Sequence, residues 1–192
     1  GVQVGDRRVV YPWIGCGECA ACQRGEEQLC TPGRALGIAV NGGFADHVII
    51  PHSRYLFDKG NVSDSLAATY ACSGLTAYSA LKKVGEIHSD DAVVIIGAGG
   101  VGMMAIQIAI SSMDIDPIVV DIDESKLAAA RELGVTQTFN SSDLQTSKAL
   151  RKATGGAFAV LDFVGAEASV SYGLGCLRKG GMLVIVGLFG GA

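Results

Sequence analysis

The sequence predicts an α/β protein whose second half is a doubly wound parallel sheet, preceded by a smaller, irregular region. Three observations predict this fold. From about residue 91, short apolar runs alternate with segments of helical period, an order typical of parallel strands joined by helical crossovers. A glycine-rich turn follows the first apolar run. Four of the six cysteines and three of the four prolines precede residue 60, within sequence that has little periodicity.

The composition excludes several classes of protein. The 192 residues include 27 glycines, 49% are hydrophobic and only 18% are charged. That apolar content can bury a core, which excludes a disordered chain, and no heptad pattern indicates a coiled coil. A net charge of −4 argues against a general nucleic-acid binder. It also gives no reason for attraction to anionic lipid, so we expect neither nucleic acid nor membrane as a partner.

The uncharged stretch 92–113 has the length of a membrane span. Four glycines interrupt it directly after its first five residues, which favours a strand, a tight turn and a buried helix instead. The opening residues also lack the order of basic, apolar and small residues found in a signal peptide. We therefore expect a cytoplasmic protein.

The first region contains two strand-like runs, Arg8–Tyr11 and Phe44–Ile50, separated by a long loop of Gly, Cys and Pro. A loop of this length inside a compact domain requires a function or a cross-link. From about Asp64 the period becomes helical. We expect helices at Ser65–Tyr70 and Leu75–Lys83, broken near Ser73-Gly74, and a domain boundary between residues 1–63 and 64–192.

The second region is expected to form five strands and four connecting helices. The expected strands are Ala92–Ile96, Ile118–Asp121, Thr136–Phe139, Ala159–Asp162 and Met182–Val186. The expected helices are Val101–Ser112, Glu124–Leu133, Leu144–Ala153 and Glu167–Leu177.

The glycine-rich turn lies between the first of these strands and its helix. Its sequence is Gly97-Ala98-Gly99-Gly100-Val101-Gly102, which fits G-x-G-x-x-G. Gly97 permits a tight turn, Gly99 lets the backbone approach a pyrophosphate, and Gly102 lets the helix pack on the strand. Free N–H groups at the start of the helix would bind the anion. The turn therefore predicts a dinucleotide site; a sheet with a tight turn and no nucleotide is the alternative.

The acid that ends the second strand indicates which dinucleotide would bind. Asp121 lies about 20 residues beyond the turn, where a carboxylate accepts hydrogen bonds from the adenosine ribose. A 2′-phosphate would be repelled there, and the following Ile122 and Asp123 supply no arginine. NAD is therefore favoured over NADP. Asp123 is also a candidate cap for the next helix.

The cysteine loop has the spacing C-x2-C-x2-C-x7-C, formed by Cys16, Cys19, Cys22 and Cys30. Four thiolates this close can enclose a tetrahedral ion, and four cysteines with no open position indicate structural zinc. An iron–sulfur cluster is an alternative, although the last spacing departs from the ferredoxin pattern. Disulfides would suit a secreted protein. A nucleic-acid zinc ribbon would need basic surroundings, whereas the loop has one arginine against three glutamates.

These motifs, in this order, resemble the zinc-dependent medium-chain alcohol dehydrogenases. Further matching segments are Gly5-Asp6-Arg7, Gly42-Gly43-Phe44-Ala45-Asp46 and Cys72-Ser73-Gly74-Leu75-Thr76-Ala77-Tyr78, so the resemblance covers essentially the whole chain. It implies a GroES-like, β-rich catalytic domain before the Rossmann-type sheet. It also implies zinc and NAD as cofactors, an alcohol or aldehyde as substrate, and a homo-oligomer, either a dimer or a tetramer.

The resemblance assigns roles to individual residues. Cys72, which by itself would be interpreted as an ordinary buried thiol like Cys176, is similar to the third protein ligand of the catalytic zinc. Thr76, Val101 and, with less support, Val186 correspond to nicotinamide contacts, and Asp121 with Lys126 to the pair that holds the adenosine ribose.

The chain also departs from the family pattern. The first two catalytic ligands, a Cys and the His of a Gly-His-Glu motif, precede the cysteine loop in the family and have no counterpart here. His47, His52 and His88 lie in no such motif. We expect a form of the enzyme that lacks its N-terminal catalytic segment and its C-terminal end, with little dehydrogenase activity of its own. The alternatives are a non-catalytic module that binds NAD and zinc and, more weakly, an iron–sulfur redox protein.

Overall fold

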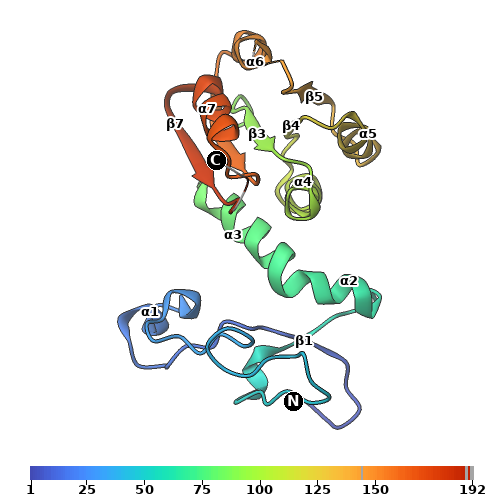
Figure 1. Ribbon diagram of the computed structural model, residues 1–192, viewed down its shortest axis with the longest axis vertical. Coiled ribbons are helices and arrows are strands. Elements are labelled where there is room, and N and C mark those ends of the chain that lie inside the picture. Colours follow the sequence, from blue (N-terminus) through green and yellow to red (C-terminus); the bar gives the residue numbers. More distant parts are fainter. Residues whose placement is uncertain (144, 189, 191–192) are drawn as a thin grey trace. The chain divides into compact units, whose positions relative to one another are not determined.

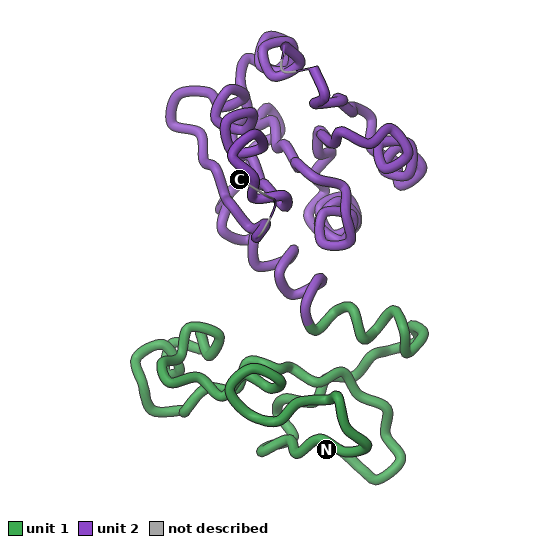
Figure 2. The backbone as a smooth tube through the Cα atoms, viewed as in Figure 1, with its two compact units in different colours: residues 1–71 green, residues 72–192 purple. Residues whose placement is uncertain are grey.

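A computed structural model describes residues 1–143, 145–188 and 190. The chain divides into two compact units, Gly1–Ala71 (unit 1) and Cys72–Ala192 (unit 2), which Figure 2 distinguishes by colour. The expected start of a helix at Leu144 lies outside the described residues. The domain boundary expected after residue 63 stays a prediction.

Unit 1 contains little regular structure. A two-stranded antiparallel sheet pairs β1 (Arg8–Val10) with β2 (Leu56–Asp58), with Val9 opposite Phe57. The remaining elements are α1 (Ala20–Gln23), the 3₁₀ turns η1 (Glu27–Leu29) and η2 (Ser53–Tyr55), and α2 (Asp64–Thr69). Ser63 caps α2 by accepting a hydrogen bond from the backbone N–H of Leu66.

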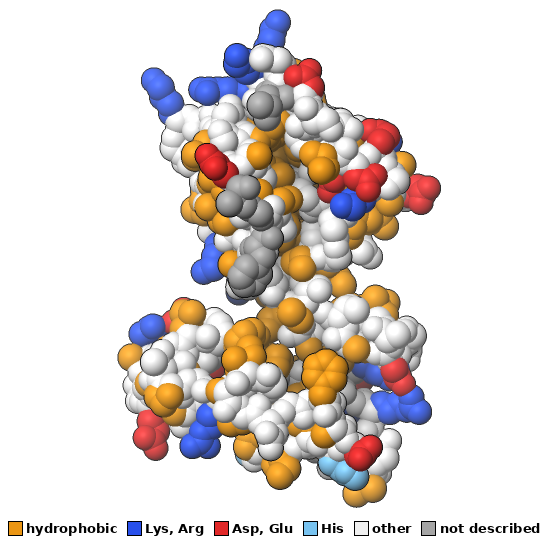
Figure 3. Space-filling view, in the orientation of Figure 1, with side chains coloured by type: hydrophobic (Ala, Val, Ile, Leu, Met, Phe, Trp, Pro, Cys, Tyr) orange, Lys and Arg blue, Asp and Glu red, His pale blue; other side chains and the backbone are white. Residues whose placement is uncertain are grey.

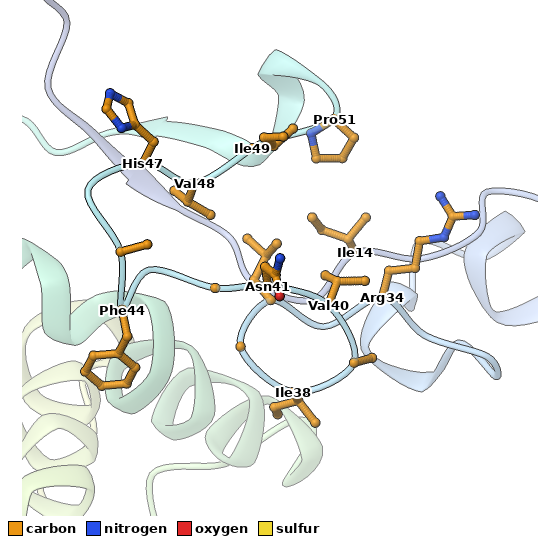
Figure 4. A pocket seen from close by; sticks show the side chains of 15 residues that line it. Ile14, Arg34, Ile38, Val40, Asn41, Phe44, His47, Val48, Ile49 and Pro51 are labelled. Carbon is orange, nitrogen blue, oxygen red and sulfur yellow. The ribbon is translucent and has the colours of Figure 1, made fainter.

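The strand expected at Phe44–Ile50 is wrong. This segment has no regular structure and pairs with no strand in unit 1, all of whose residues the structure describes; β1 pairs instead with Leu56–Asp58. An apolar run forms a strand only where a neighbour takes its backbone hydrogen bonds. Phe44 and Ile49 are exposed, and the segment lines an apolar hollow of about 850 Å³ together with Ile14 and Val40 (Figure 4).

The expected break near Ser73-Gly74 is also wrong. A π-helical turn, η3 (Tyr70–Gly74), occupies this position and leads directly into α3 (Leu75–Lys83). Widened turns of this kind accommodate an extra residue within a helix and occur frequently at functional sites. Cys72 lies within it.

Unit 2 is a five-stranded parallel sheet with the order β5-β4-β3-β6-β7. Its strands are β3 (Val93–Ile96), β4 (Ile118–Asp121), β5 (Gln137–Asn140), β6 (Ala157–Asp162) and β7 (Leu177–Ile185). The connecting helices are α4 (Gly100–Met113), α5 (Glu124–Glu132), α6 (Thr146–Thr154) and α7 (Glu167–Cys176). The predicted doubly wound sheet is therefore confirmed.

Strand β7 starts earlier than the sequence predicts. The last helix ends at Cys176, and the strand begins at Leu177, opposite Ala157. The pairing then continues with Ala159 opposite Met182, so the extra residues on β7 form a bulge. This bulge hides the strand from pattern analysis because it interrupts the apolar alternation.

The sheet is covered on both faces (Figure 1). Val93 and Ile95 face a buried layer that includes residues of α3, α4 and α5, such as Leu81, Ile106 and Leu127. Val94 and Ile96 face a second layer with residues of α6 and α7. Because both faces are buried, the central strands are continuous apolar runs rather than alternating ones.

The strand order reverses direction at β3, which lies between β4 and β6. In sheets of this kind, ligands bind in the crevice outside the carboxyl ends of the strands at this switch point. The glycine turn follows β3 and therefore lies at that edge. Within the described residues, no helix combines the length and the apolar character needed to cross a membrane.

Candidate cofactor and metal sites

The glycine turn has the geometry that each of its glycines predicts. Gly97 has φ +90°, in the region that favours glycine. A Cβ atom at Gly102 would lie 1.8 Å from the carbonyl oxygen of Gly97, so only glycine permits this approach of helix to strand. At Gly99 and Gly100 a Cβ atom would meet nothing within 4 Å. The outer surface of the turn is therefore open to a ligand.

The start of α4 supplies unpaired donors beside this open surface. No side chain caps the helix at Gly99. The first N–H groups of an α-helix have no partner within the helix, and the helix dipole favours an anion at this end. A pyrophosphate is the anion that such a turn accommodates.

Asp121 connects the turn to the end of β4. Its carboxylate accepts a hydrogen bond from the backbone N–H of Ala98 at 2.7 Å and another from that of Asp123 at 2.9 Å. The side chain is 6% exposed, and Nζ of Lys126 lies 3.9 Å from Oδ1. Each carboxylate oxygen keeps a second lone-pair site. The structure thus brings the two residues of the predicted ribose pair together, beside the glycine turn.

Asp123 caps α5, as its alternative interpretation predicts. Its carboxylate accepts hydrogen bonds from the backbone N–H of Ser125 at 2.9 Å and from the Ser125 hydroxyl at 2.7 Å. These bonds hold the pKa of Asp123 below its usual value. Since this carboxylate is engaged at the helix start, Asp121 is the acid available to a ribose.

Asp162, at the end of β6, is a second buried acid that sequence reasoning did not single out. Its side chain is 0% exposed. It accepts hydrogen bonds from the backbone N–H groups of Val164 and Gly165 at 2.9 and 3.1 Å, and from the Ser169 hydroxyl at 2.8 Å. Its carbonyl oxygen accepts the N–H of Val186 at 2.8 Å. Asp162 therefore positions the loop after β6 and places Val186 at the carboxyl edge of the sheet.

Thr76 and Val101 lie on two helices that pack against each other in unit 2. Thr76 precedes Ala77, a fully buried residue of the layer beneath α4, and Val101 packs against the same layer. Both side chains are partly exposed. Their predicted contact with a nicotinamide ring stays a prediction.

The four cysteines of the loop converge. Their sulfur atoms all lie within 4.8 Å of one another. The sulfur of Cys22 is 3.9 Å from that of Cys16 and 3.5 Å from that of Cys19. A tetrahedral zinc ion with sulfur ligands separates them by about 3.8 Å. The thiols therefore fit one tetrahedral ion, and none of the six cysteines forms a disulfide.

The backbone around the cluster favours its ionised form. The N–H groups of Glu18 and Cys19 point at the sulfur of Cys16 and lower the pKa of this thiol to about 6. The N–H of Cys16 lowers the pKa of Cys30, but burial and the neighbouring thiols outweigh it and raise that pKa to about 12. A hydrogen bond from the backbone N–H of Cys22 also lowers the pKa of Cys19, whereas burial raises that of Cys22. Because thiolates are the metal ligands, Cys16 and Cys19 are favoured in the form that binds, and Cys22 and Cys30 require the cation itself.

Cys72 differs from these four. Among the residues that the structure describes, it belongs to no group of three or more potential metal ligands, although like Cys16 it is exposed. The histidines are outside such groups as well. His52 accepts a hydrogen bond from the backbone N–H of Arg54 through Nδ1, at 3.0 Å, as a local cap.

Sequence reasoning missed two residues of these sites, Asp162 and Glu27, and only the first could have been identified from the sequence. Asp162 ends the apolar run Ala159-Val160-Leu161 just as Asp121 ends Ile118-Val119-Val120, so comparison of strand ends could have identified it. Glu27, which contacts the cysteine loop, carried no such signal, because its partner Tyr55 is distant in sequence.

Comparison with known families agrees with this geometry. Residues 1–59 match the model of the alcohol dehydrogenase GroES-like domain, and residues 100–192 match that of the zinc-binding dehydrogenases. The first region includes the cysteine loop, and the second begins within the glycine turn, at Gly100. The two matches are in the order in which the sequence predicts the two kinds of domain.

Individual relatives extend the match to the whole chain. A NAD-dependent alcohol dehydrogenase of Sulfolobus acidocaldarius is 40% identical over 100% of this chain, which spans 55% of that relative. The solved alcohol dehydrogenase of Aeropyrum pernix is 30% identical with a TM-score of 0.87, covering 100% of this chain and 57% of that one. The solved D-arabinose dehydrogenase of Sulfolobus solfataricus is 27% identical with a TM-score of 0.86, covering 97% and 59%. The chain therefore spans little more than half of these relatives, and it belongs to the zinc-dependent medium-chain alcohol dehydrogenase family.

Proposed function

We propose that this chain supplies the NAD-binding domain and part of the catalytic domain of an alcohol dehydrogenase, which oxidises an alcohol reversibly to an aldehyde or ketone. The observation that carries this proposal is the Asp121 carboxylate, bonded to the N–H of Ala98 within the glycine turn. When bound, NAD supplies a hydride acceptor and a catalytic zinc lowers the pKa of the substrate hydroxyl.

The residues of this chain act by binding and orientation. The open backbone at Gly99 and Gly100 and the free N–H groups of α4 receive the pyrophosphate. The Asp121 carboxylate accepts hydrogen bonds from the ribose hydroxyls, and Lys126 lies beside it. Thr76, Val101 and Val186 would hold the nicotinamide end, and Cys72 would donate a thiolate to the catalytic zinc. The four-cysteine loop would bind a separate, structural zinc.

The substrate class is an alcohol or its carbonyl product. The relatives include enzymes named for alcohols and one named for a sugar, so the family resemblance supports the reaction rather than one compound. A homo-oligomer, as a dimer or tetramer, and a cytoplasmic location are part of the same proposal.

Calorimetric titration with NAD tests the cofactor assignment. We expect Asp121→Asn to weaken NAD binding by about tenfold or more, because a ribose hydroxyl loses a charged acceptor whose bonds contribute about 1.5–3 kcal/mol. Wild-type chain should bind NADP more weakly than NAD, and Asp121→Asn should narrow that difference. Glu132→Gln, an exposed change at the end of α5, is the matched control. Equal NAD affinity for Asp121→Asn and wild type would refute the ribose assignment.

Metal analysis tests the zinc assignment. We expect one zinc per chain, lost on Cys22→Ser and kept on Cys72→Ser. Four sulfur atoms within 4.8 Å enclose a single ion rather than a multi-iron core, so the purified protein should be colourless. A brown sample with visible absorbance would support the iron–sulfur alternative instead.

We infer little or no alcohol oxidation by this chain alone, since Cys72 belongs to no group of three or more potential ligands in residues 1–143, 145–188 and 190. Clear turnover, with the termini verified by mass spectrometry, would contradict this inference. NAD binding without turnover would also fit a non-catalytic module.

A further inference from the structure

Glu27 lies within the cysteine loop, between Cys22 and Cys30, and its side chain contacts Gly15, the residue before the first cysteine. One carboxylate oxygen, Oε2, accepts the backbone N–H of Gly15 at 2.8 Å and the hydroxyl of Tyr55 at 2.6 Å. The other, Oε1, is 3.0 Å from Nη2 of Arg54. The side chain is 17% exposed. Both oxygens are thus engaged by partners outside the thiol cluster, and Glu27 itself is not one of the clustered ligands.

Gly15 connects this carboxylate to the thiols. A Cβ atom at Gly15 would lie 2.4 Å from the sulfur of Cys22 and 2.9 Å from Cγ of Glu27. The backbone at Gly15 is therefore enclosed between a cluster thiol and the glutamate side chain. Since Cys16 follows directly, a hydrogen bond that fixes Gly15 also fixes the first metal ligand.

The same residue reaches the other end of the loop. The backbone N–H of Cys30 donates to the carbonyl oxygen of Glu27 at 3.0 Å. The N–H of Cys16 in turn donates to the sulfur of Cys30 at 3.2 Å. Glu27 thus contacts the segment before the first thiol through its side chain and the last thiol residue through its main chain.

Tyr55 and Arg54 attach this arrangement to the small sheet of unit 1. Tyr55 is 4% exposed, its ring stacks on Tyr11 at 6.3 Å, and its carbonyl oxygen accepts the N–H of Tyr11 at 2.8 Å. The guanidinium of Arg54 lies 4.7 Å from the centre of the Tyr55 ring and donates to the Tyr55 hydroxyl. Four thiolates around a divalent cation carry two net negative charges, so a further carboxylate here requires a cation such as Arg54.

We propose that Glu27 is a positioning residue for the structural metal: with Tyr55 and Arg54 it holds both ends of the four-cysteine loop at the spacing that a tetrahedral ion requires. Partners of this kind, which orient metal ligands without touching the metal, change metal affinity by about 10–100-fold when removed. The inference rests on the zinc site of the proposed function.

The test uses the whole chain loaded with zinc, and measures zinc release to a chromophoric chelator. Glu27→Ala should release zinc about 10–100-fold faster than wild type. Tyr55→Phe should accelerate release as well, and the double variant should be no faster than Glu27→Ala, because the two side chains act as one unit. Glu26→Ala removes a neighbouring glutamate whose side chain pairs with exposed Arg24, and should release zinc at the wild-type rate.

Cobalt in place of zinc supplies a second readout. Its visible absorption depends on the tetrahedral geometry of the thiolates, so we expect weaker and broader bands for Glu27→Ala and restored bands for Glu27→Gln, which keeps an oxygen acceptor for Gly15. Trp13, the single tryptophan, lies close to the loop in sequence and reports unfolding of unit 1.

The outcomes separate the hypotheses. Faster release by a variant whose Trp13 fluorescence matches that of zinc-loaded wild type before the chelator is added supports positioning. Release at the wild-type rate overturns the proposal. Faster release from a zinc-loaded variant whose unit 1 is already perturbed before the chelator is added also overturns it, because the role is then merely structural. If Glu27→Ala fails to fold, the release rate of Tyr55→Phe decides. A wild-type chain that takes up no zinc overturns the metal site itself, whereas one that binds zinc and ignores these substitutions overturns only the inference about Glu27.

Discussion

Unit 2 buries an apolar layer on each face of its sheet, whereas the buried hydrophobic residues of unit 1 are Ile14, Cys30, Tyr55 and Ala67. Unit 1 also leaves large apolar side chains exposed, among them Val4, Ile38, Phe44 and Ile49. Figure 3 shows hydrophobic surface on the visible face of unit 1 (the lower part of the view).

This difference indicates two sources of stability. Burial at about 25 cal/mol per Å² stabilises unit 2, because its central strands β3, β4 and β6 are almost completely removed from water. Unit 1 has too small a core to rely on that term, and domains of this kind usually depend on a metal or on further polypeptide. Its polar connections, the thiol cluster and the Glu27 contacts, therefore determine its structure more than its apolar residues do.

Removal of the metal should produce the largest difference in stability between the two units. A structural zinc in a small domain contributes about 10–16 kcal/mol of binding free energy at neutral pH, so a chelator should disorder the cysteine loop. We expect amide hydrogen exchange to accelerate across residues 15–30 and to stay unchanged across β3 and β4. Cys22→Ser should reproduce the effect without chelator, and Cys72→Ser should not. Simultaneous loss of protection in both units would show that the metal stabilises the whole chain.

A cavity in the sheet should have the opposite effect to metal removal: it should destabilise unit 2 and leave the metal loop of unit 1 unchanged. Leu161 lies on β6 and is fully buried in the layer that includes residues of α3, α4 and α5, so Leu161→Ala should cost about 2–5 kcal/mol of unfolding free energy. Urea unfolding followed by far-UV circular dichroism measures this loss, while the zinc content should stay at the wild-type value. Leu174→Ala, at a side chain 57% exposed, is the control and should change little. Loss of zinc from Leu161→Ala would contradict the separation of the units.

Within unit 2, substitutions at two glycines of the turn should affect stability and NAD binding differently. A methyl group at Gly102 would collide with the carbonyl oxygen of Gly97, so Gly102→Ala should cost about 1–3 kcal/mol and reduce NAD affinity with it. Gly100→Ala places its methyl group in open space and should leave the unfolding midpoint unchanged while it weakens NAD binding. Thermal unfolding and calorimetry measure the two effects. Equal destabilisation by both substitutions would contradict the assignment of separate roles to these glycines.

The same contrast explains what the sequence could predict. In unit 2, the central strands β3, β4 and β6 are local apolar runs, and the glycine turn follows β3 directly while Asp121 ends β4, so the sheet, the glycine turn and Asp121 were all predictable. In unit 1, the pairing of Arg8–Val10 with Leu56–Asp58 joins segments with a long loop between them. No local pattern encodes that pairing, and the more apolar run at Phe44–Ile50 was the stronger, but wrong, candidate.

The metal loop lies between these cases. The spacing of its cysteines predicted the cluster, because short spacings force the thiols together whatever the surrounding fold. The residues that hold the loop in place could not be predicted from the sequence, since Glu27 and Tyr55 are brought together by the tertiary structure of unit 1. Ligands that are close in sequence can be predicted, whereas the residues that orient them require the tertiary structure.

Loss of the ion pair between Asp91, which precedes β3, and Arg178 of β7 should have the smallest effect on unit 2. The Asp91 carboxylate, with its side chain 5% exposed, accepts the backbone N–H of His88 at 3.0 Å and pairs with Arg178 of β7 at 2.8 Å. The hydrogen bond from His88 and the charge of Arg178 hold the pKa of Asp91 below its usual value. A lowered pKa stabilises the folded state above the unfolded value of about 3.9 and loses that effect as the pH falls through the folded value.

Asp91→Asn should therefore lower the urea midpoint of unit 2 slightly at pH 7. The difference from wild type should shrink as the pH falls below about 4, because the carboxyl group is then protonated first in the unfolded state and, at lower pH, in the folded state. Urea titrations at several pH values, followed by circular dichroism, measure this convergence. Asp90→Asn changes the adjacent, exposed acid and should match wild type throughout. A difference that stays constant at low pH would mean that Asp91 contributes through its shape rather than its charge.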